Sequence, residues 1–266
     1  MTTRNGNPVA LTIAGFDPTA GAGVVPDIQA FTSFGCAAAA AITSLTFQNA
    51  DTFFGAAHQS AAVIREQLNS ILAGTRIASV KTGMLPTSEI VREVVKFVRE
   101  SKIPAPVVDP LLTSTSGYDL IDDDAWALLV RDLMPLARVI TPNIPEAERI
   151  TGQRISNEAE MRQATQRMRE MGANAVLIKG GHLGGQPAEE DLDPPLPPQA
   201  IDLLDDEGEV TVFRNEWIEG RGMRGTGCRL SAAIAAGLAN GRELKESVAA
   251  AKRYVADQLA QSKKRG

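Results

Sequence analysis

The chain has 266 residues, of which 44% are apolar and 22% charged, an ordinary composition for a globular protein large enough to bury a substantial core. Its net charge is −5, from 27 basic and 32 acidic side chains. Nucleic-acid-binding proteins need a clustered basic face, so this charge argues against that class. The one basic run, at 263–265, predicts a solvated tail.

The cysteine content and the apolar runs indicate the cellular compartment of the protein. Cys36 and Cys228 are too few for a disulfide framework and lack metal-ligand spacing. The first seven residues are polar, which predicts no signal peptide, and the apolar run at 37–45 is too short to span a bilayer. We therefore expect a cytoplasmic protein with neither a membrane nor a nucleic-acid partner.

Short apolar runs alternate with longer segments of helical periodicity. In chain order, we predict strands at 9–14, 37–45, 77–81, 106–108, 138–140 and 175–178, separated by helices at 26–34, 61–72, 87–100, 124–136 and 157–171. This alternation predicts an α/β protein with a parallel sheet covered by helices on both faces.

The alternation breaks in the last third of the chain. A proline-rich, acidic segment predicts an exposed loop. The sequence Asp206-Glu207-Gly208, between two apolar segments, predicts the turn of a hairpin. The elements expected here are the loop at 186–199, strands at 200–204 and 209–214, and helices at 226–238 and 243–261. No linker or internal repeat divides the sequence, so we expect one domain over residues 1–266.

Polar residues and glycines follow the predicted strands at the point where each strand ends. They are Gly15, Asp17, Gln48, Asn49, Gly83, Met84, Asp109, Asn143 and Lys179. Each one alone is explained by turn chemistry. Because ligands bind at the carboxyl ends of strands in open parallel sheets, their recurrence at six ends predicts a site there.

The segment from Arg224 to Cys228, Arg-Gly-Thr-Gly-Cys, leads into an alanine-rich helix. Glycines let the backbone approach a phosphate closely, and the free N–H groups at a helix start can bind it. The helix dipole would also lower the pKa of Cys228, whose thiolate could accept a proton from a substrate hydroxyl. The structural alternative is a tight turn into a packed helix, with Cys228 as a small buried residue.

Eight segments, at 10–18, 21–27, 45–49, 81–85, 107–110, 141–147, 179–183 and 225–228, occur in the order found in one enzyme family. Together they resemble the ribokinase superfamily and, within it, the hydroxymethylpyrimidine/phosphomethylpyrimidine kinases of thiamin biosynthesis. The resemblance covers residues 10 to about 261. It implies a three-layer ribokinase-like fold with a central, mostly parallel sheet.

The same resemblance implies roles for the residues that would surround the substrate ring. The backbone at Gly15 and the side chains of Asp27 and Gln48 would bind the aminopyrimidine edge. Met84 and Val108 would line the apolar walls of the ring pocket. The alternatives are a helix-surface aspartate, a strand-end glutamine and, for the two apolar residues, plain core packing.

A second group of residues is implied at the phosphates. Asn143 and Glu146 match an Asn-x-x-Glu element that organises Mg²⁺ and phosphate, although this spacing also suits a helix N-cap with a first-turn acid. Asp109 would lie near the phosphates, with Asp109 and Glu146 as metal-binding carboxylates. For Asp109 the alternative is strand-end turn chemistry.

The implied reaction is in-line transfer of the γ-phosphoryl group of ATP to a primary hydroxyl, with Mg²⁺ bound. Lys179 would face the ATP phosphates. Gly225, Thr226 and Gly227 would form an anion hole, and Cys228 would stand where sugar kinases carry an aspartate base. In this family the same pocket then phosphorylates the monophosphate to the diphosphate.

The chain departs from the family pattern at several positions. Phe16 replaces a small hydroxyl residue, Ala20 replaces a glycine, and Thr115 stands where the family carries a lysine. Met223 and Arg224 replace a Thr-His pair. Arg224 could supply a phosphate-binding charge that Thr115 no longer offers, or it could be a surface cation.

These departures leave other functions open beside the pyrimidine kinase. A pyridoxal kinase would act on another ring that carries a primary hydroxymethyl group. A degenerate, non-catalytic binding protein would keep the fold alone, although Asn143, Glu146, Lys179 and Cys228 argue against it. The family also implies a homodimer acting on a small-molecule substrate.

Overall fold

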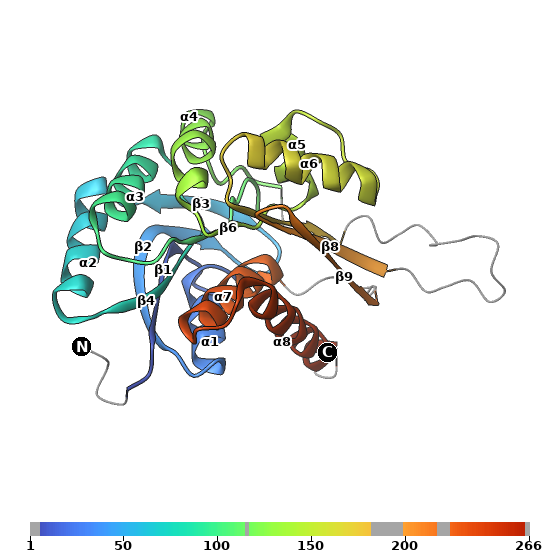
Figure 1. Cartoon of the computed structure of the whole chain (residues 1–266). Coiled ribbons are helices and arrows are strands. Elements are labelled where there is room, and N and C mark those ends of the chain that lie inside the picture. The colour runs from blue at the N-terminus through green and yellow to red at the C-terminus, as the bar shows by residue number, and fades with distance from the viewer. Residues whose placement is uncertain (1–5, 115–116, 182–198, 217–223, 264–266) are drawn as a thin grey trace, which may run out of the picture.

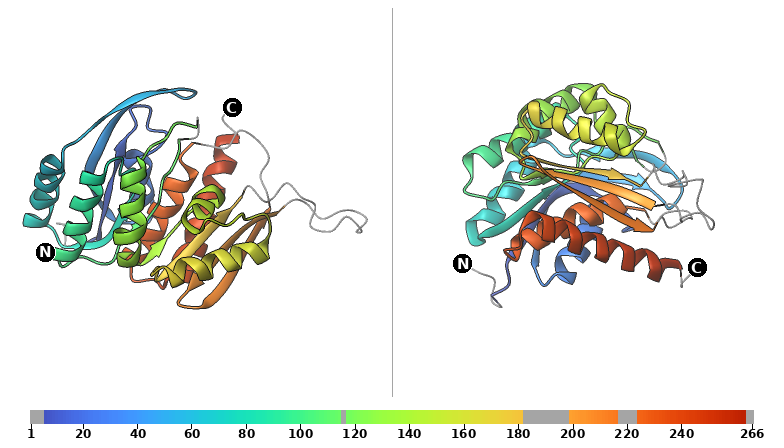
Figure 2. Two further views of the ribbon diagram at one scale, coloured as in Figure 1. Left: turned by 90° about the horizontal axis from the view of Figure 1, so that it is seen from above. Right: turned by 45° about the vertical axis from the view of Figure 1, so that its right-hand side comes forward.

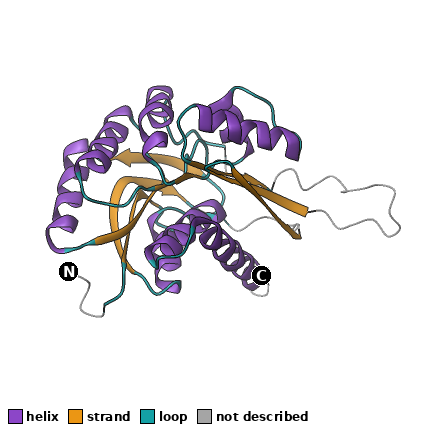
Figure 3. Ribbon diagram, in the orientation of Figure 1, coloured by secondary structure: helices purple, strands orange, loops and turns teal. Residues whose placement is uncertain are grey.

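The computed structural model describes residues 6–114, 117–181, 199–216 and 224–263. Within them, one nine-stranded sheet has helices on both faces, which confirms the predicted α/β class (Figure 1, Figure 3). The strands are β1 (Val9–Phe16), β2 (Ala37–Gln48), β3 (Phe53–His58), β4 (Ile77–Thr82), β5 (Val107–Val108), β6 (Val139–Ile140), β7 (Ala175–Gly180), β8 (Gln199–Asp206) and β9 (Glu209–Glu216).

The sheet has the order β3-β2-β1-β4-β5-β6-β7-β8-β9. The six adjacent strands β2, β1, β4, β5, β6 and β7 run parallel, as predicted. Antiparallel strands extend both edges, β3 on one side and the β8–β9 pair on the other. The predicted hairpin accounts for β8 and β9, whose turn places Glu207 and Gly208 at positive φ.

The structure differs from the predicted strands in two ways at the β2–β3 edge of the sheet. Strand β2 continues to Gln48, beyond the predicted end at residue 45, and β3 was not predicted. Strand β3 reads Phe-Phe-Gly-Ala-Ala-His, with Gly55 inside it, and lacks the alternation of apolar and polar residues that marks a half-buried strand. Only pairing with β2 makes this segment a strand.

The described helices are α1 (Val24–Ser33), α2 (Ala61–Gly74), α3 (Ser88–Glu100), α4 (Asp123–Leu128), α5 (Ile144–Thr151), α6 (Glu158–Glu170), α7 (Thr226–Ala239) and α8 (Leu244–Lys263). Helix α5 was not predicted as an element. The helix predicted at 124–136 continues from α4 as a π-turn, Leu129–Leu133, and a 3₁₀ turn, Met134–Leu136. Pro135, which has no N–H to donate, lies in that last turn.

The helices form two layers, and alternate residues of each strand point into opposite layers. Helices α2 to α6 pack on one face, where Leu11 and Ile13 of β1 meet them, while Ala10 faces the other layer. Helices α1, α7 and α8 cover that second face (Figure 2). This three-layer arrangement leaves the carboxyl ends of the parallel strands as the edge where a ligand can enter.

Some predictions fall outside the described residues. These are the loop over 186–198, Thr115, Met223 and the last part of the basic tail. Among the helices that the structure does describe, none is both long and apolar enough to cross a bilayer.

Candidate active site

A cavity of about 1620 Å³ extends along the carboxyl ends of the parallel strands. Of the predicted site residues, it is lined by Gly15, Gln48, Met84, Asn143, Glu146, Lys179, Arg224, Gly225, Thr226, Gly227 and Cys228. Asp27, Val108 and Asp109 are fully buried and are not among its lining residues. Val108 packs in the hydrophobic core on the face covered by α2 to α6, which was the alternative stated for it.

The glycine turn before α7 brings two parts of this cavity together. Gly225 adopts the left-handed conformation with φ 71°, and a side chain there would strike the carbonyl oxygen of Gly21. A Cβ on Gly227 would lie 3.2 Å from Nζ of Lys179. The turn therefore lies between the loop after β1 and the lysine at the end of β7, with the N-terminus of α7 directed at the same space.

Cys228 is buried at the start of α7 and lines the cavity. Burial raises the pKa of its thiol to about 11, although the Lys81 ammonium and a hydrogen bond from the Gly23 backbone act in the opposite direction. The prediction that the helix dipole lowers this pKa is therefore wrong for the ligand-free protein. Desolvation of the thiolate outweighs the favourable charges around it.

A buried ion pair that sequence reasoning did not select lies next to Cys228. Nζ of Lys81 is 2.8 Å from Oδ2 of Asp27, which also accepts a hydrogen bond of 2.6 Å from Thr12. Both charged side chains are inaccessible to solvent. Burial alone would lower the pKa of Lys81, but the Asp27 carboxylate raises it, so the ammonium stays charged.

Asp27 and Lys81 have different relations to the cavity. Lys81 is one of its lining residues, whereas Asp27 lies behind and holds the ammonium in place. Burial raises the pKa of Asp27 more strongly than Lys81 lowers it, and its Oδ1 has no hydrogen-bond partner among the described residues. The available signal for Lys81 was a lysine near the end of a short strand predicted to be buried.

Lys179 and Asp109 form a second buried pair. Nζ of Lys179 is 2.9 Å from Oδ1 of Asp109, and the hydroxyl of Ser231 on α7 donates to Oδ2 at 3.3 Å. Burial would raise the pKa of Asp109, but the charges of Lys179 and Lys81 lower it. Asp109 is therefore a carboxylate, and Lys179 presents a charged ammonium to the cavity.

Asn143 and Glu146 form a capping box at the start of α5, as the alternative for this pair stated. The Asn143 side chain accepts from the Glu146 N–H at 2.9 Å, and the Glu146 carboxylate accepts from the Asn143 N–H at 2.7 Å. A β-bridge joins Asn143 to Lys179, so the cap lies beside the second ion pair. Burial raises the pKa of Glu146 to about 7, with Lys179 lowering it and Asp109 raising it.

These carboxylates fit a magnesium ion that is itself held partly by phosphates. Among the described residues, no group of three or more His, Cys, Asp and Glu side chains could enclose a metal. Mg²⁺ commonly uses one or two carboxylates together with substrate phosphates and water. Glu146 lines the cavity and supplies one such carboxylate, and a cation would relieve the repulsion from Asp109 that disfavours its ionised form. Asp109 is fully buried, and its two oxygens are bonded to Lys179 and Ser231.

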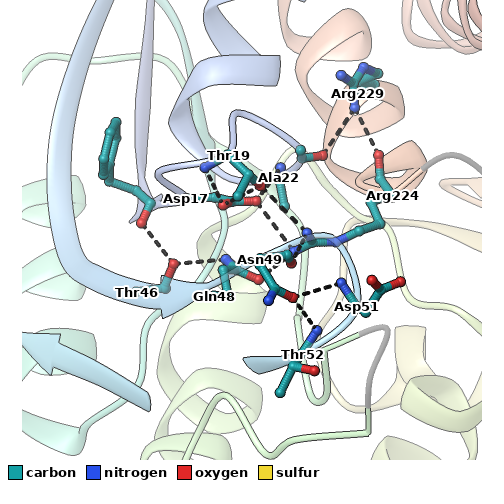
Figure 4. Close-up of polar contacts among 12 residues, drawn as sticks. Asp17, Thr19, Ala22, Thr46, Gln48, Asn49, Asp51, Thr52, Arg224 and Arg229 are labelled. Carbon is teal, nitrogen blue, oxygen red and sulfur yellow. Dashed lines mark hydrogen bonds and ion pairs between the residues drawn. The ribbon is translucent and has the colours of Figure 1, made fainter. Parts of the chain in front are cut away.

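The Arg224 side chain points toward the loop after β1 and the end of β2 (Figure 4). Its Nη2 donates to Oδ2 of Asp17 at 3.3 Å and to Oε1 of Gln48, and its Nη1 donates to the backbone carbonyl of Asn49 at 2.5 Å. The guanidinium thus contacts the ring side predicted from the sequence. The sequence left a phosphate-binding charge and a surface cation as the two possibilities; a side chain that is 21% accessible and bonded to Asp17, Gln48 and Asn49 is not a free surface cation.

Two other departures from the family pattern, at Phe16 and Ala20, lie at the end of β1 and in the turn after it. The backbone carbonyl of Phe16 accepts a hydrogen bond from Thr46 at 2.9 Å, and its side chain is not among the lining residues. Ala20 has a φ of 57°, a conformation that favours glycine. The replacement of glycine there is therefore accommodated at the expense of backbone strain.

A parallel α/β sheet with a glycine turn at a helix N-terminus, flanked by a buried lysine and two carboxylates, is suited to binding phosphates and transferring a phosphoryl group. The sequence model of the phosphomethylpyrimidine kinase family matches residues 17–266. The chain belongs to this family and is a kinase.

Individual relatives agree with this membership. The chain is 38% identical over 258 residues to the thiamine biosynthesis bifunctional protein ThiED of Geobacter sulfurreducens, covering 96% of this chain but only half of that protein. It is 40% identical over 248 residues to a hydroxymethylpyrimidine/phosphomethylpyrimidine kinase of Rhizobium meliloti, covering 93% and 88% of the two chains.

Solved structures show the same fold. The phosphomethylpyrimidine kinase of Clostridium difficile superposes with a TM-score of 0.81 at 34% identity, over 95% of this chain and 100% of that one. The pyridoxal kinase of Staphylococcus aureus, in complex with AMP-PCP and pyridoxal, gives 0.81 at 29% identity, over 95% and 88%.

Proposed function

We propose that the chain phosphorylates 4-amino-5-hydroxymethyl-2-methylpyrimidine, and then its monophosphate, with ATP, as a cytoplasmic enzyme of thiamin biosynthesis. The observation that carries the proposal is one cavity that holds Gln48 and Met84 at one end and Lys179 and Glu146 at the other, with the glycine turn between. The names of the relatives support the choice of substrate.

The mechanism follows from the charges on the cavity wall. Lys179 and the N-terminus of α7 would neutralise charge on the transferred phosphoryl group, which is the main catalytic contribution in such reactions. The substrate hydroxyl oxygen forms a bond to the γ-phosphorus while the bond to the β-phosphate oxygen breaks, releasing ADP. In the second transfer an oxygen of the substrate monophosphate is the nucleophile.

The hydroxyl proton must leave late in this transfer. Cys228, beside the glycine turn, would take it. Because the pKa of the thiol is raised to about 11, few molecules carry a thiolate at neutral pH, yet each thiolate is a strong base. A buried Lys81 ammonium would stabilise the thiolate when it forms, and Gly23 would donate a backbone hydrogen bond to it.

A magnesium ion, when bound, supplies Lewis-acid neutralisation of the ATP phosphates. Glu146 would hold it from the cavity wall, oriented by the Asn143 backbone N–H, and Asp109 would be the second carboxylate by exchanging its bond to Lys179 for one to the ion. The bonds from Lys179 and Ser231 keep Asp109 ionised and fixed in direction before the ion arrives.

The likeness to a pyridoxal kinase supports a second candidate substrate. Both rings carry a primary hydroxymethyl group, and the phosphate end of the cavity would serve either. The aspartate base of sugar kinases is replaced here by Cys228, which favours the pyrimidine. A non-catalytic binding protein is the third candidate, and the retained charges of Lys179, Asp109 and Glu146 argue against it.

One assay separates the three candidates. Purified protein with MgATP is offered the hydroxymethylpyrimidine, its monophosphate, pyridoxal and a set of sugars, and ADP release is followed. We expect turnover of both pyrimidines. Turnover of pyridoxal alone would assign the second candidate, and the absence of turnover with every substrate would assign the third. A Cys228→Ala variant that kept the full rate would eliminate the proposed base.

We also propose that residues 1–266 act as one kinase domain within a homodimer. The β2–β3 edge exposes Leu45, Phe47 and Phe54, which are 41%, 53% and 66% accessible. An exposed apolar sheet edge is a surface that proteins commonly cover. Sedimentation velocity at micromolar concentration would show a single 28 kDa species if the dimer does not form.

A further inference from the structure

A chain of hydrogen bonds runs across the ring end of the cavity (Figure 4). The Thr46 hydroxyl donates to the backbone carbonyl of Phe16 at 2.9 Å, and Nε2 of Gln48 donates to Oγ1 of Thr46 at 2.7 Å. Arg224 closes the chain by donating to Oε1 of Gln48. It links the end of β1, the end of β2 and the turn before α7.

This chain fixes which way the Gln48 amide points. The oxygen and nitrogen of an amide can exchange places by a half-turn, so the neighbouring groups must decide between them. The Thr46 hydroxyl donates its hydrogen to the Phe16 carbonyl and therefore accepts a hydrogen bond from the amide nitrogen. A guanidinium can only donate, so Arg224 requires the amide oxygen opposite it. Both ends of the Gln48 amide are thereby assigned.

The orientation determines what the amide offers to a ligand. Thr46 takes one of the two amide N–H groups, and Arg224 takes one of the two lone pairs on the oxygen. One N–H donor and one acceptor direction remain for a ligand. An aminopyrimidine presents the complementary pair, a ring nitrogen that accepts next to an amino group that donates. A pyridoxal ring carries no amino group.

The guanidinium is itself held in place. Its Nη2 also donates to Asp17, which is fixed by the backbone N–H groups of Thr19 at 2.9 Å and Ala22 at 3.0 Å. Nη1 of Arg229 donates to the Arg224 carbonyl at 2.9 Å. The Arg224 side chain is 21% accessible, so solvent competes little for these contacts.

We propose that Arg224 is a positioning residue that sets substrate choice: it locks the Gln48 amide in the orientation that recognises an aminopyrimidine edge. The inference rests on the proposed function and adds a role to a residue that departs from its family. Arg224 acts through Gln48 rather than on the phosphates, and its loss therefore affects the ring and not the nucleotide.

The test compares Arg224→Met, which keeps the aliphatic stem but donates nothing, with Arg224→Lys, which keeps one charged donor. We expect Arg224→Met to raise KM for the hydroxymethylpyrimidine about ten-fold, the value of one lost oriented hydrogen bond, with KM for MgATP unchanged. The preference for the pyrimidine over pyridoxal, as a ratio of kcat/KM, falls by a similar factor. Arg224→Lys restores most of both.

A double-mutant cycle with Gln48→Ala tests whether Arg224 works through the amide. In the Gln48→Ala background, adding Arg224→Met should change KM for the pyrimidine less than two-fold, because the group that it orients is gone. Arg138→Met is the matched control, since Arg138 also makes a forked contact, with Asp206 at 2.7 and 2.9 Å, at the opposite edge of the sheet. It should leave both KM values unchanged.

The outcomes distinguish the two proposals. A wild-type protein that does not phosphorylate the pyrimidine overturns the proposed function and this inference with it. An active wild type whose Arg224→Met variant raises KM for MgATP, or keeps its KM for the pyrimidine, overturns the inference alone. Additive effects of the Gln48 and Arg224 substitutions do the same.

Discussion

Cys228, Lys81 and Lys179 share one electrostatic neighbourhood at the residue scale, although they come from α7, β4 and β7. Each lysine is buried against its own aspartate, and both ammonium groups interact with the thiol. Burial nevertheless raises the pKa of Cys228 to about 11. The site therefore keeps both ammonium groups charged and the Cys228 thiol mostly protonated at neutral pH.

The first prediction at this scale concerns Lys81. Lys81→Met leaves the Asp27 carboxylate buried with only Thr12 as a partner, and this should lower the free energy of unfolding by about 3 kcal/mol. Because burial raises the pKa of Asp27 in the folded state, the loss grows as pH rises above 4 and the carboxyl must ionise. Urea unfolding followed by circular dichroism measures this loss of stability between about pH 5 and 8. The lower limit lies about one unit above the ordinary pKa of an aspartate.

Two further variants control that measurement. Lys96→Met removes an exposed lysine from a 4.0 Å pair with Glu100 and should change stability by less than about 0.5 kcal/mol. Asp27→Asn combined with Lys81→Met removes both charges and should recover part of the loss. Equal stability of wild type and Lys81→Met would show that the buried pair does not stabilise the fold.

At the scale of elements, three segment ends determine the geometry of the site. The capping box begins α5 at Asn143, the left-handed Gly225 begins α7, and the N-terminal turn of α1 follows Gly23, whose φ is 69°. Each element starts within the cavity region because a cap or a glycine stops the preceding segment there. The ends of these elements therefore also line the cavity.

The cap at Asn143 gives the prediction at this scale. Asn143→Ala removes an acceptor from the Glu146 N–H and should cost about 1 kcal/mol of stability. The backbone N–H of residue 143 still holds the Glu146 carboxylate, so the expected fall in kcat/KM for MgATP, about ten-fold, comes from loosening of the first turn of α5. Chemical denaturation and steady-state kinetics together measure the two effects.

Asn157→Ala offers a matched control on the next helix. Asn157 caps α6 in the same way, with its side chain 2.9 Å from the Glu160 N–H, but lies outside the cavity. It should lose similar stability and keep full activity. If both variants lose activity in proportion to stability, the Asn143 cap has no role beyond helix formation.

At the scale of the whole molecule, the cavity joins residues that are far apart in the sequence. Its lining runs from Ala14 to Ala260 and takes side chains from both helical layers and from the antiparallel hairpin. A ligand that contacts all of them can bind only the folded chain. Binding must therefore stabilise the fold as a whole.

The prediction at this scale is a thermal shift. Mg²⁺ with the non-hydrolysable nucleotide AMP-PCP, at one hundred times Kd, should add about 2.7 kcal/mol of stability and raise Tm by roughly 5–10 °C. Lys179→Met should abolish that shift but keep the shift caused by the hydroxymethylpyrimidine. Differential scanning fluorimetry compares them. A nucleotide shift of the same size in Lys179→Met would place the nucleotide away from Lys179.

The sequence by itself determined the layer architecture, since apolar runs and amphipathic segments alternate from β1 to β7. It also located most of the cavity, because residues at strand ends in a parallel sheet share one edge. It missed β3 and α5, the first defined only by pairing with β2 and the second too short to show helical periodicity.

Tertiary structure alone decided three properties of the site. The pKa of Cys228 depends on how much protein covers it, which local sequence does not encode. The Lys81–Asp27 pair joins residues 54 positions apart, and the Arg224–Gln48 contact joins residues 176 apart. Burial and long-range pairing are properties of the folded chain, because they arise only when distant segments exclude water from each other.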